Sequence, residues 1–454
     1  MKKIIVIGGG AAGAKAASKA KRLNPDNLIE LYTNEDVIAF SLCGLPYYIE
    51  GSVGDVNKLI VRTPEDFKKN GINVFTNHTL EKIIPEENCV KINNNHIFYD
   101  ELILALGAKV HIPKIKNIKA NNVYTLRSIA SGVEIRNKML KSKKVLIIGG
   151  GYISIELTEA FIKNGLEVVI IEKNEHLASD FDYDFADKIH KIIMEKTGQN
   201  CQILYSTQVV EFKKDENNNF ISAITDKNEE IEADFVVLST GAYPNVATAA
   251  SAGIHLGLSG AIKVDNRMRT NFNHIFAVGD CAEKYCIITR QADYIGLGTI
   301  ANKEGRVAAI NAVRPDNPEN MDGILGSTIT RFFDYTISKT GLSYKKAKQL
   351  TNVINLEPIE ATVVKSDRAS YMPNASEFSI KLIADKRSGE ILGGQAIGKN
   401  GTVAQRINTI TSILQSRQTI EDILHLDLPY APPFSGSIDP ILTAAYKLKE
   451  LSKK

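Results

Sequence analysis

Two short apolar runs, each followed by glycines and then by a helix-like stretch, dominate the hydrophobic pattern of this chain. Residues 4–7 (Ile-Ile-Val-Ile) lead into a glycine-rich segment at 8–13 and an alanine-rich stretch at 14–20. Residues 145–148 (Val-Leu-Ile-Ile) lead into a second glycine-rich segment at 149–154. A short continuous apolar run that ends in glycines is typical of a buried strand of a parallel sheet. The pattern therefore predicts two copies of a strand–loop–helix unit in an α/β fold.

The glycine spacing within each copy indicates a dinucleotide site. In a G-x-G-x-x-G loop the glycines permit a tight turn and let the backbone approach a pyrophosphate, whose charge meets a helix N-terminus. The second copy starts 141 residues after the first and carries Ser154 where a third glycine is usual. The predicted loop residues are Gly8, Gly10, Ala11 and Gly13 in the first copy and Gly149, Gly151, Tyr152, Ile153 and Glu156 in the second. Two loops predict two bound dinucleotides.

An acidic residue follows the strand after the second loop. Glu172 directly follows the run Glu167–Ile171 and lies about 18 residues past Ser154. In dinucleotide-binding folds an acid at this position binds the 2′-hydroxyl of the adenosine ribose. Because a 2′-phosphate would be repelled there, NADH is favoured over NADPH, although Lys173 offsets part of that repulsion. The matching position after the first loop is Thr33, which with Asn34 is expected to bind ribose in place of an acid.

Cys43 is the strongest candidate for redox chemistry. It lies in Phe-Ser-Leu-Cys-Gly-Leu-Pro-Tyr-Tyr at 40–48, and no second cysteine follows within ten positions. Gly44 and Pro46 predict a turn into a short helix, and a thiol at a helix N-terminus is shifted toward the nucleophilic thiolate. The alternative is a small buried hydrophobic residue, as most such cysteines are. A disulfide partner of Cys43 would come from a small molecule or from a distant part of the fold.

Length, charge and cysteine content narrow the class of protein. The 454 residues are enough for about three domains. A net charge of +3 and a pI near 8.3 give no reason to expect nucleic acid or an anionic membrane as a partner. The five cysteines are too scattered for a secreted disulfide framework, and no apolar run approaches the length of a membrane span. We expect a cytoplasmic enzyme without a metal.

Further motifs follow in a defined order. Residues 102–107 and 236–241 have the pattern of buried strands that stop at a glycine, and residues 270–280 contain a short apolar strand that ends in Gly279-Asp280. From about residue 322 the pattern changes to strands (329–335, 361–364, 378–383, 390–397) followed by helices (404–416, 420–424, 438–449). This change predicts a separate α+β domain.

The order of these motifs resembles the pyridine nucleotide-disulfide oxidoreductases over nearly the whole chain. The resemblance implies two Rossmann-like domains, for FAD and NAD, and a C-terminal α+β dimerisation domain in a homodimer. It implies FAD-binding segments at 1–118 and 251–321, an NAD-binding domain at 119–250 and a dimerisation domain at 322–454. It assigns Thr33, Asn34, Ala105, Gly107, Gly279 and Asp280 to FAD together with the first loop, and Glu172 and Gly241 to NAD together with the second, with Tyr152 as a gate.

Cys43 resembles the single-cysteine branch of this family, which contains NADH oxidases, NADH peroxidases and coenzyme A-disulfide or persulfide reductases. The dithiol branch has Cys-x4-Cys here, and this chain has Tyr48 at the second position. Cys281 and Cys286 have that spacing, but they follow the second flavin motif, so we interpret them as incidental. The dithiol branch also has a C-terminal histidine, whereas no histidine follows His425.

Within the branch, several positions separate reductases from oxidases. Oxidases and peroxidases resemble one another in a histidine in the first loop, where this chain has Ala11. The Tyr430-Ala-Pro-Pro-Phe-Ser segment and the Cys43-Gly-Leu-Pro-Tyr-Tyr segment are similar to coenzyme A-disulfide reductases. Tyr371-Met-Pro is more similar to oxidases, and Ala39 and Leu42 depart from residues that are frequent in reductases.

The helix after the first loop supplies a substrate hypothesis. Lys15, Lys19 and Arg22 are spaced to share one face. The phosphates of coenzyme A would suit such a basic stripe, and the resemblance places coenzyme A on this helix; the alternative is a solvated basic face. We therefore expect an NADH-dependent flavoprotein that reduces coenzyme A disulfide, coenzyme A persulfide or polysulfide through Cys43, with Tyr430 as a proton donor. The alternatives are an NADH oxidase or peroxidase that uses a cysteine sulfenic acid, and a non-enzymatic redox sensor.

Overall fold

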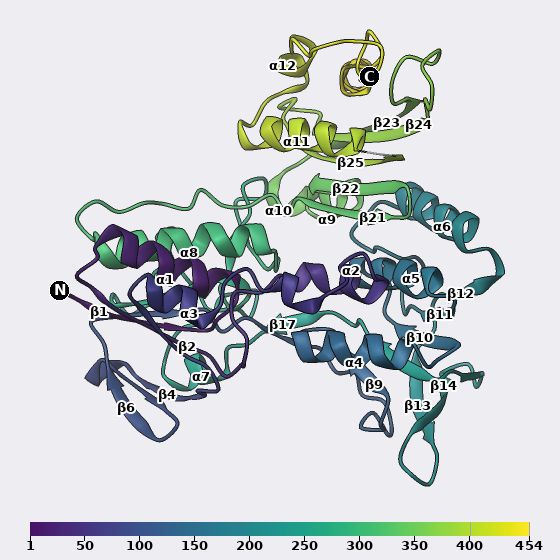
Figure 1. Cartoon of the computed structure of the whole chain (residues 1–454). Coiled ribbons are helices and arrows are strands. Elements are labelled where there is room, and N and C mark those ends of the chain that lie inside the picture. Colours follow the sequence, from purple (N-terminus) through teal and green to yellow (C-terminus); the bar gives the residue numbers. More distant parts are fainter. Residues whose placement is uncertain (400, 454) are drawn as a thin grey trace. The chain divides into compact units, whose positions relative to one another are not determined.

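The computed structural model describes residues 1–399 and 401–453 of the chain (Figure 1). The chain forms two compact units, each assembled from three separate stretches of sequence. Unit 1 contains Met1–Ile112, Arg127–Glu134 and Gly241–Ile324, and unit 2 contains Pro113–Leu126, Ile135–Thr240 and Leu325–Lys454. Within the described residues, none of the helices combines the length and the apolar character that a membrane crossing requires. The predicted domain boundaries after residues 118, 250 and 321 stay predictions.

Unit 1 is built on a five-stranded parallel sheet with the order β18-β7-β1-β2-β3. Its strands are β1 (Lys3–Ile7), β2 (Leu28–Tyr32), β3 (Ile72–Phe75), β7 (Glu101–Leu104) and β18 (Ile275–Ala277). The helices α1 (Ala11–Leu23) and α8 (Gly298–Val313) lie side by side and pack with the sheet in one apolar core. The predicted first strand, loop and helix are therefore confirmed, because β1 is buried between two parallel neighbours.

Smaller elements complete unit 1. An antiparallel sheet consists of β4 (Leu80–Ile84), β5 (Cys89–Ile92) and β6 (Asn95–Phe98). Two further pairs are β8 (Ala108–Val110) with β17 (Ala242–Pro244), and β19 (Lys284–Tyr285) with β20 (Ala292–Asp293). The short helices are η1 (Leu42–Gly44), α2 (Leu45–Glu50), η2 (Val56–Leu59), α3 (Pro64–Lys69), η3 (Pro85–Glu87), α7 (Ala247–Ser251) and η5 (Gly279–Cys281). The helix α4 (Ile129–Met139) contains the boundary after Glu134.

Unit 2 contains the second parallel sheet, with the order β12-β11-β10-β16-β9. Its strands are β9 (Val123–Thr125), β10 (Lys144–Ile148), β11 (Glu167–Ile171), β12 (Cys201–Leu204) and β16 (Phe235–Leu238). The accompanying elements are α5 (Tyr152–Lys163), α6 (Tyr183–Thr197), η4 (Gly198–Asn200), β13 (Val209–Lys214), β14 (Phe220–Thr225) and β15 (Glu230–Glu232). The repeat predicted from the sequence is thus confirmed as a second strand–loop–helix unit.

The C-terminal part of unit 2 is an antiparallel sheet with helices, as the change of pattern predicts. The strands β21 (Thr328–Phe332), β22 (Tyr335–Gly341), β25 (Ile391–Lys399), β24 (Glu377–Asp385) and β23 (Pro358–Ser366) follow one another in the sheet. The helices are α9 (Tyr344–Gln349), α10 (Thr351–Ile354), α11 (Thr402–Gln415), α12 (Ile420–Leu424) and α13 (Pro440–Ser452). The predicted strand 329–335 is wrong as one element, because a turn at Phe333, in the left-handed region at φ 54°, separates β21 from β22.

A buried lysine connects three carboxylates within unit 2. The Nζ atom of Lys381 on β24 lies 2.6 Å from Glu360, 2.7 Å from Asp184 and 3.4 Å from Asp182. Burial alone would lower the pKa of Lys381, but hydrogen bonds to Asp184 and Glu360 outweigh it and raise the pKa above its ordinary value. Lys381 is therefore a charged residue whose loss leaves negative charges close together.

We expect Lys381→Met to lower the free energy of unfolding by roughly 3–5 kcal/mol, because it leaves the buried carboxylate of Asp182 and the partly buried one of Glu360 without their cation. Urea denaturation followed by circular dichroism measures the change. Lys188→Met is the matched control, because Lys188 pairs with the exposed Glu377 at 3.6 Å and should cost less than about 1 kcal/mol. Equal effects of the two changes would contradict this account of Lys381.

Candidate active site

The first glycine loop is shaped by close contacts that exclude side chains. Gly8 is in the left-handed region at φ 113°, and a Cβ atom there would lie 2.0 Å from the carbonyl oxygen of Ala105. A Cβ atom on Gly13 would lie 1.9 Å from the carbonyl oxygen of Gly8. Gly10 is different, because it caps α1 and has open space where its Cβ would be. The loop therefore presents a helix N-terminus to an open space, which suits an anionic phosphate.

The second loop repeats this geometry with one substitution. Gly149 is at φ 107°, and its Cβ would lie 2.3 Å from the carbonyl oxygen of Ser239. Gly151 caps α5 and again faces open space. Ser154 occupies the position of the third glycine, and its hydroxyl donates a 2.6 Å hydrogen bond to the carbonyl oxygen of Gly149. The serine thus fixes the turn through a hydrogen bond where the first loop uses close glycine packing.

The strand register aligns the two ribose positions that the sequence predicts. Ile148 pairs with Ile171 in unit 2 and Ile7 pairs with Tyr32 in unit 1, so Glu172 and Thr33 follow equivalent strand ends. Both side chains are buried, whereas Asn34 is exposed.

The carboxylate of Glu172 points back toward the second loop. It accepts hydrogen bonds from the backbone nitrogen and the side-chain nitrogen of Asn174, at 2.8 and 2.5 Å. A Cβ atom on Gly150 would lie 2.8 Å from its Oε2 atom. The acid is therefore fixed beside the loop.

The Gly279-Asp280 turn lies at the end of β18, next to the strand that ends in Leu104. The backbone nitrogen of Val278 donates to the carbonyl oxygen of Leu104 at 2.9 Å. The carboxylate of Asp280 lies 3.1 Å from the guanidinium of Arg127. Arg127 is a further candidate site residue that the sequence alone did not reveal, because it belongs to no motif and lies far from Asp280 in the chain.

Two further predicted glycines, Gly107 and Gly241, lie within unit 1. Gly107, at φ 67°, would place a Cβ atom 4.0 Å from the guanidinium of Arg127. Gly241, at φ 91°, accepts a 2.9 Å hydrogen bond from the backbone nitrogen of His111. Both positions favour glycine because of their left-handed backbone.

Cys43 lies on η1, immediately before α2, as the sequence predicts. The loop that carries it is attached to the first glycine loop, because the backbone nitrogen of Ala39 donates to the carbonyl oxygen of Gly9 at 2.8 Å. Ala39 adopts the left-handed region at φ 49°. Cys43 is exposed, whereas the other four cysteines are buried. Solvent therefore reaches the Cys43 thiol beside a predicted dinucleotide loop.

Cys281 and Cys286 do not share the setting of Cys43. Both are buried, and burial raises the pKa of Cys281 to about 11. A thiol with so high a pKa is protonated at neutral pH and is a poor nucleophile. This environment supports the interpretation of their spacing as incidental.

Two predicted residues of the second loop contact the C-terminal sheet within unit 2. The hydroxyl of Tyr152 lies 3.0 Å from Asp180 and 2.6 Å from the hydroxyl of Thr328 on β21. Burial raises the pKa of Tyr152 well above its ordinary value. Glu156 accepts a 2.8 Å hydrogen bond from Thr330, and burial raises its pKa as well. The exposed Ile153 stands between them in sequence.

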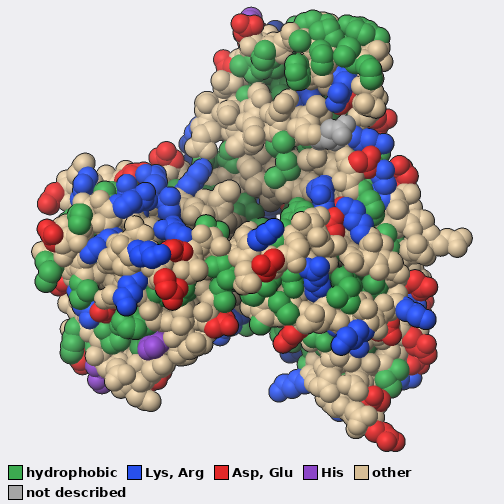
Figure 2. All heavy atoms as spheres, in the orientation of Figure 1, with side chains coloured by type: hydrophobic (Ala, Val, Ile, Leu, Met, Phe, Trp, Pro, Cys, Tyr) green, Lys and Arg blue, Asp and Glu red, His purple; other side chains and the backbone are tan. Residues whose placement is uncertain are grey.

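The basic stripe on α1 is larger than the sequence predicts. Lys15 and Lys19 are half-buried and Arg22 is exposed. Arg62, which no sequence motif marks, reaches the same helix and donates from Nη1 to the hydroxyl of Ser18 at 2.9 Å. Figure 2 shows Lys and Arg side chains gathered over α1 and α8. The face has the charge that a polyphosphate ligand requires.

Tyr430 lies in the segment between α12 and α13 of unit 2. It is half exposed, and a hydrogen bond between Tyr371 and Tyr430 raises the pKa of Tyr371. Arg406 ties the flanking loops together, because its guanidinium donates to Asp439 at 3.1 Å and to the carbonyl oxygen of Asp367 at 3.2 Å. The structure thus brings together two tyrosines that belong to separate motifs of the sequence.

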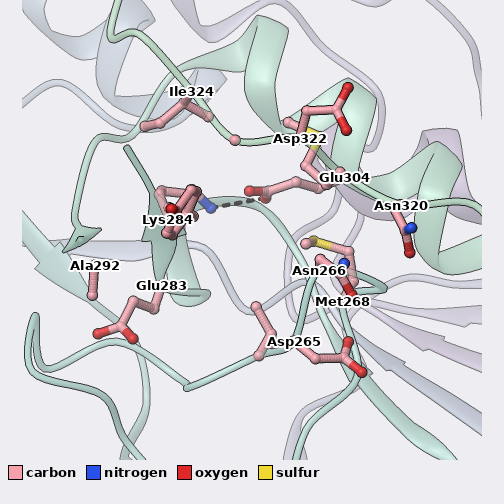
Figure 3. A pocket seen from close by; sticks show the side chains of 14 residues that line it. Asp265, Asn266, Met268, Glu283, Lys284, Ala292, Glu304, Asn320, Asp322 and Ile324 are labelled. Atoms are coloured by element: carbon pink, nitrogen blue, oxygen red, sulfur yellow. Dashed lines mark hydrogen bonds and ion pairs between the residues drawn. The ribbon is translucent and has the colours of Figure 1, made fainter. Parts of the chain in front are cut away.

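A cavity of about 510 Å³ lies in unit 1, and no residue that the sequence predicted as a site residue lines it (Figure 3). Its walls include Asp265, Glu283, Asp322 and the ion pair between Lys284 and Glu304. Within residues 1–399 and 401–453, no three His, Cys, Asp or Glu side chains lie close enough together to hold a metal ion.

The chain matches two family models. The model described as pyridine nucleotide-disulphide oxidoreductase matches residues 2–305, and the model of the dimerisation domain of the same family matches residues 327–440.

Individual relatives match over nearly the whole chain. The chain is 33% identical to an NAD(P)H sulfur oxidoreductase (CoA-dependent) of Pyrococcus abyssi, over 99% of this chain and 98% of that protein. It is 31% identical to an NADH oxidase of Methanocaldococcus jannaschii, over 99% of each. It is 28% identical to a coenzyme A disulfide reductase of Staphylococcus haemolyticus, over 99% and 100%. The solved structure of an NAD-dependent persulfide reductase from A. fulgidus matches with a TM-score of 0.94 at 33% identity, over 99% of this chain and 84% of that one.

Proposed function

The chain belongs to the pyridine nucleotide-disulphide oxidoreductase family, and from this premise we propose that it reduces coenzyme A disulfide, or a coenzyme A persulfide or polysulfide. In this proposal electrons pass from NADH through FAD to Cys43 and then to the substrate. The observation that carries the proposal is the exposed thiol of Cys43 on a loop attached to the first glycine loop by the 2.8 Å bond from Ala39 to Gly9. The relatives named for coenzyme A-dependent sulfur and disulfide reduction support the same substrate class.

The residues around the two loops fit two dinucleotides. In unit 1, the open space at Gly10 and the carboxylate of Asp280 suit the pyrophosphate and the ribityl chain of FAD. In unit 2, the open space at Gly151 and the buried Glu172 suit the pyrophosphate and the ribose of NADH. When bound, FAD supplies the chemistry that converts the hydride of NADH into the two electrons needed to reduce a disulfide.

Cys43 performs thiol–disulfide exchange in this mechanism. Its thiolate attacks one sulfur of coenzyme A disulfide, forms a mixed disulfide with that half and releases the other half as a thiolate. Two electrons then reduce the mixed disulfide to the Cys43 thiolate and a second coenzyme A thiolate. The thiolates that leave take up protons, and Tyr430 is the residue we assign to that step. The balance per turnover is one NADH and one proton consumed and two thiols released.

We also propose a cytoplasmic homodimer in which Tyr430 acts on Cys43 of the other subunit. The match to a dimerisation domain supports the dimer. A two-fold interface is isologous, so the C-terminal segment of each chain can reach the partner's site. Exposed apolar side chains near Tyr430, namely Tyr371, Phe434 and Ile438, suit burial in such an interface.

An NADH oxidase or peroxidase that uses a Cys43 sulfenic acid is the second candidate. The relative named NADH oxidase from Methanocaldococcus jannaschii favours it. Ala11 argues against it, because the family resemblance implies a histidine at that position in oxidases and peroxidases. Reaction with disulfide and reaction with oxygen distinguish the two candidates.

The decisive test concerns Cys43. Reductant added to the native protein should release coenzyme A, identified by its mass. Cys43→Ser should keep FAD and its reduction by NADH but lose disulfide turnover, because no thiolate remains to attack the disulfide. Fast NADH consumption in air without any disulfide would overturn the reductase proposal in favour of the oxidase.

The basic stripe should control affinity for coenzyme A disulfide. Changing Lys15, Lys19 and Arg22 together to Gln should raise KM for the disulfide at least about tenfold, because charge-assisted contacts to phosphate are lost. Stopped-flow reduction of the flavin by NADH should be unchanged. The matched control changes Lys345, Lys346 and Lys348 of α9 to Gln, which removes the same charge from unit 2. An unchanged KM in the first variant would return the stripe to a solvated face.

Glu172 should set the preference for NADH. Glu172→Ala should lower the ratio of kcat/KM for NADH over NADPH by about tenfold, because it removes both a ribose acceptor and a repulsive charge. Glu172→Gln removes the negative charge but retains an oxygen that accepts a hydrogen bond, so it isolates the effect of charge. A wild-type protein that prefers NADPH tenfold would show that this account of Glu172 is wrong.

A further inference from the structure

A buried ion pair lies directly behind the turn that carries Asp280. The Nζ atom of Lys284 on β19 is 2.8 Å from Oε2 of Glu304 on α8, and the two side chains are 1% and 2% exposed. Figure 3 shows the pair in the wall of the cavity of unit 1. Neither residue has a role in the mechanism above.

Both residues hold the backbone of Gly279. Its N–H donates to Oε2 of Glu304 at 2.7 Å, and its carbonyl oxygen accepts from Nζ of Lys284 at 2.6 Å. The peptide groups on either side of this glycine are therefore fixed by side chains from two other elements. Gly279 lies in the left-handed region at φ 73°. Because glycine can adopt many other backbone conformations, this one is no longer fixed once such contacts are lost.

The turn that the pair holds also contacts the first glycine loop's helix. A Cβ atom on Gly279 would lie 3.0 Å from the Cβ of Ala12, in the first turn of α1. A Cβ atom on Gly305, next to Glu304, would lie 2.3 Å from the carbonyl oxygen of Ala12. The ion pair therefore lies where α1, α8 and the Asp280 turn meet.

A buried ion pair is weak evidence for a gain in stability. Burial raises the pKa of Glu304, which Lys284 and the N–H of Gly279 oppose. Two buried charges cost desolvation energy, and apolar residues of similar volume are often as stable in such places. What the pair does specifically is to hold the backbone conformation of Gly279.

We propose that Lys284 and Glu304 are positioning residues that orient Asp280 toward the ribityl chain of FAD. This inference rests on the flavin site proposed above. The pair acts only through the backbone of Gly279, so it does not contact the cofactor. Without the pair, the turn that carries Asp280 should move away from the orientation in which Asp280 binds flavin.

The first test measures the rate at which the diluted holoenzyme releases FAD, followed by the rise in flavin fluorescence. Lys284→Met should speed release by about tenfold or more, the effect of losing one good hydrogen bond. The double variant Lys284→Met/Glu304→Gln carries no uncompensated charge, so it should fold with a Tm near that of the wild type. It should still release FAD about tenfold faster, because Gly279 has lost the donor to its carbonyl oxygen. Release at the wild-type rate would overturn the proposal.

The second test is a double-mutant cycle with Asp280→Ala. If the pair acts through Asp280, Lys284→Met/Glu304→Gln should speed release about tenfold when Asp280 is present and less than about twofold when it is replaced. The same fold-change in both backgrounds would show that the pair only supports the fold, and would overturn the proposal.

Lys381→Met controls for general destabilisation, because it also removes a buried lysine from an ion-pair cluster but lies in unit 2. It should lower the Tm without changing the rate of FAD release; an equal acceleration of release would overturn the positioning role.

Failure of the proposed function and failure of this inference can be distinguished. A freshly purified wild-type protein without flavin would contradict the proposed function, whereas a yellow protein whose pair variants keep FAD would contradict only this inference.

Discussion

The close approach of a glycine backbone to the end of a neighbouring strand is the constraint on which both nucleotide regions depend. Gly8 faces the carbonyl oxygen of Ala105 and Gly149 faces that of Ser239, each at a distance that no side chain could occupy. Because the loops cannot move away from these strand ends, the helices that follow must start at the carboxyl edge of their sheets. The proposed phosphate and ribose positions and the Cys43 loop are all placed relative to these two contacts.

The correspondence between the two units extends beyond the glycines. In each unit an alanine in the left-handed region, Ala39 or Ala178, donates its backbone N–H to the second glycine of the loop at 2.8 Å. The segment that follows Ala39 carries Cys43, whereas the segment that follows Ala178 carries Asp182, an ion-pair partner of Lys381. One backbone arrangement thus supports an exposed cysteine, the proposed redox-active residue, in one copy and an ion-pair cluster in the other.

The sequence was sufficient for features that depend on local pattern. Apolar runs and glycine spacing predicted both parallel sheets, and the equivalence of Thr33 and Glu172 followed from counting residues to the next strand end. Arg127, Arg62 and the Lys284–Glu304 pair were not predictable, because each acts on a partner that is near only after folding. The break between β21 and β22 was missed for another reason, since a turn of two residues without glycine leaves the apolar pattern almost unchanged.

If Tyr152 acts as a gate for the coenzyme, as the family resemblance implies, coenzyme binding is thermodynamically linked to the hydrogen bonds of Tyr152. If NADH displaces the tyrosine, it must break the contacts with Asp180 and Thr328, and part of its binding free energy is used in doing so. Linkage is reciprocal, so in that case a change that strengthens the contact of Tyr152 with β21 would weaken coenzyme binding by the same factor. The strand β21 of the C-terminal sheet would therefore compete with the coenzyme for contact with Tyr152, although this sheet contains no nucleotide loop.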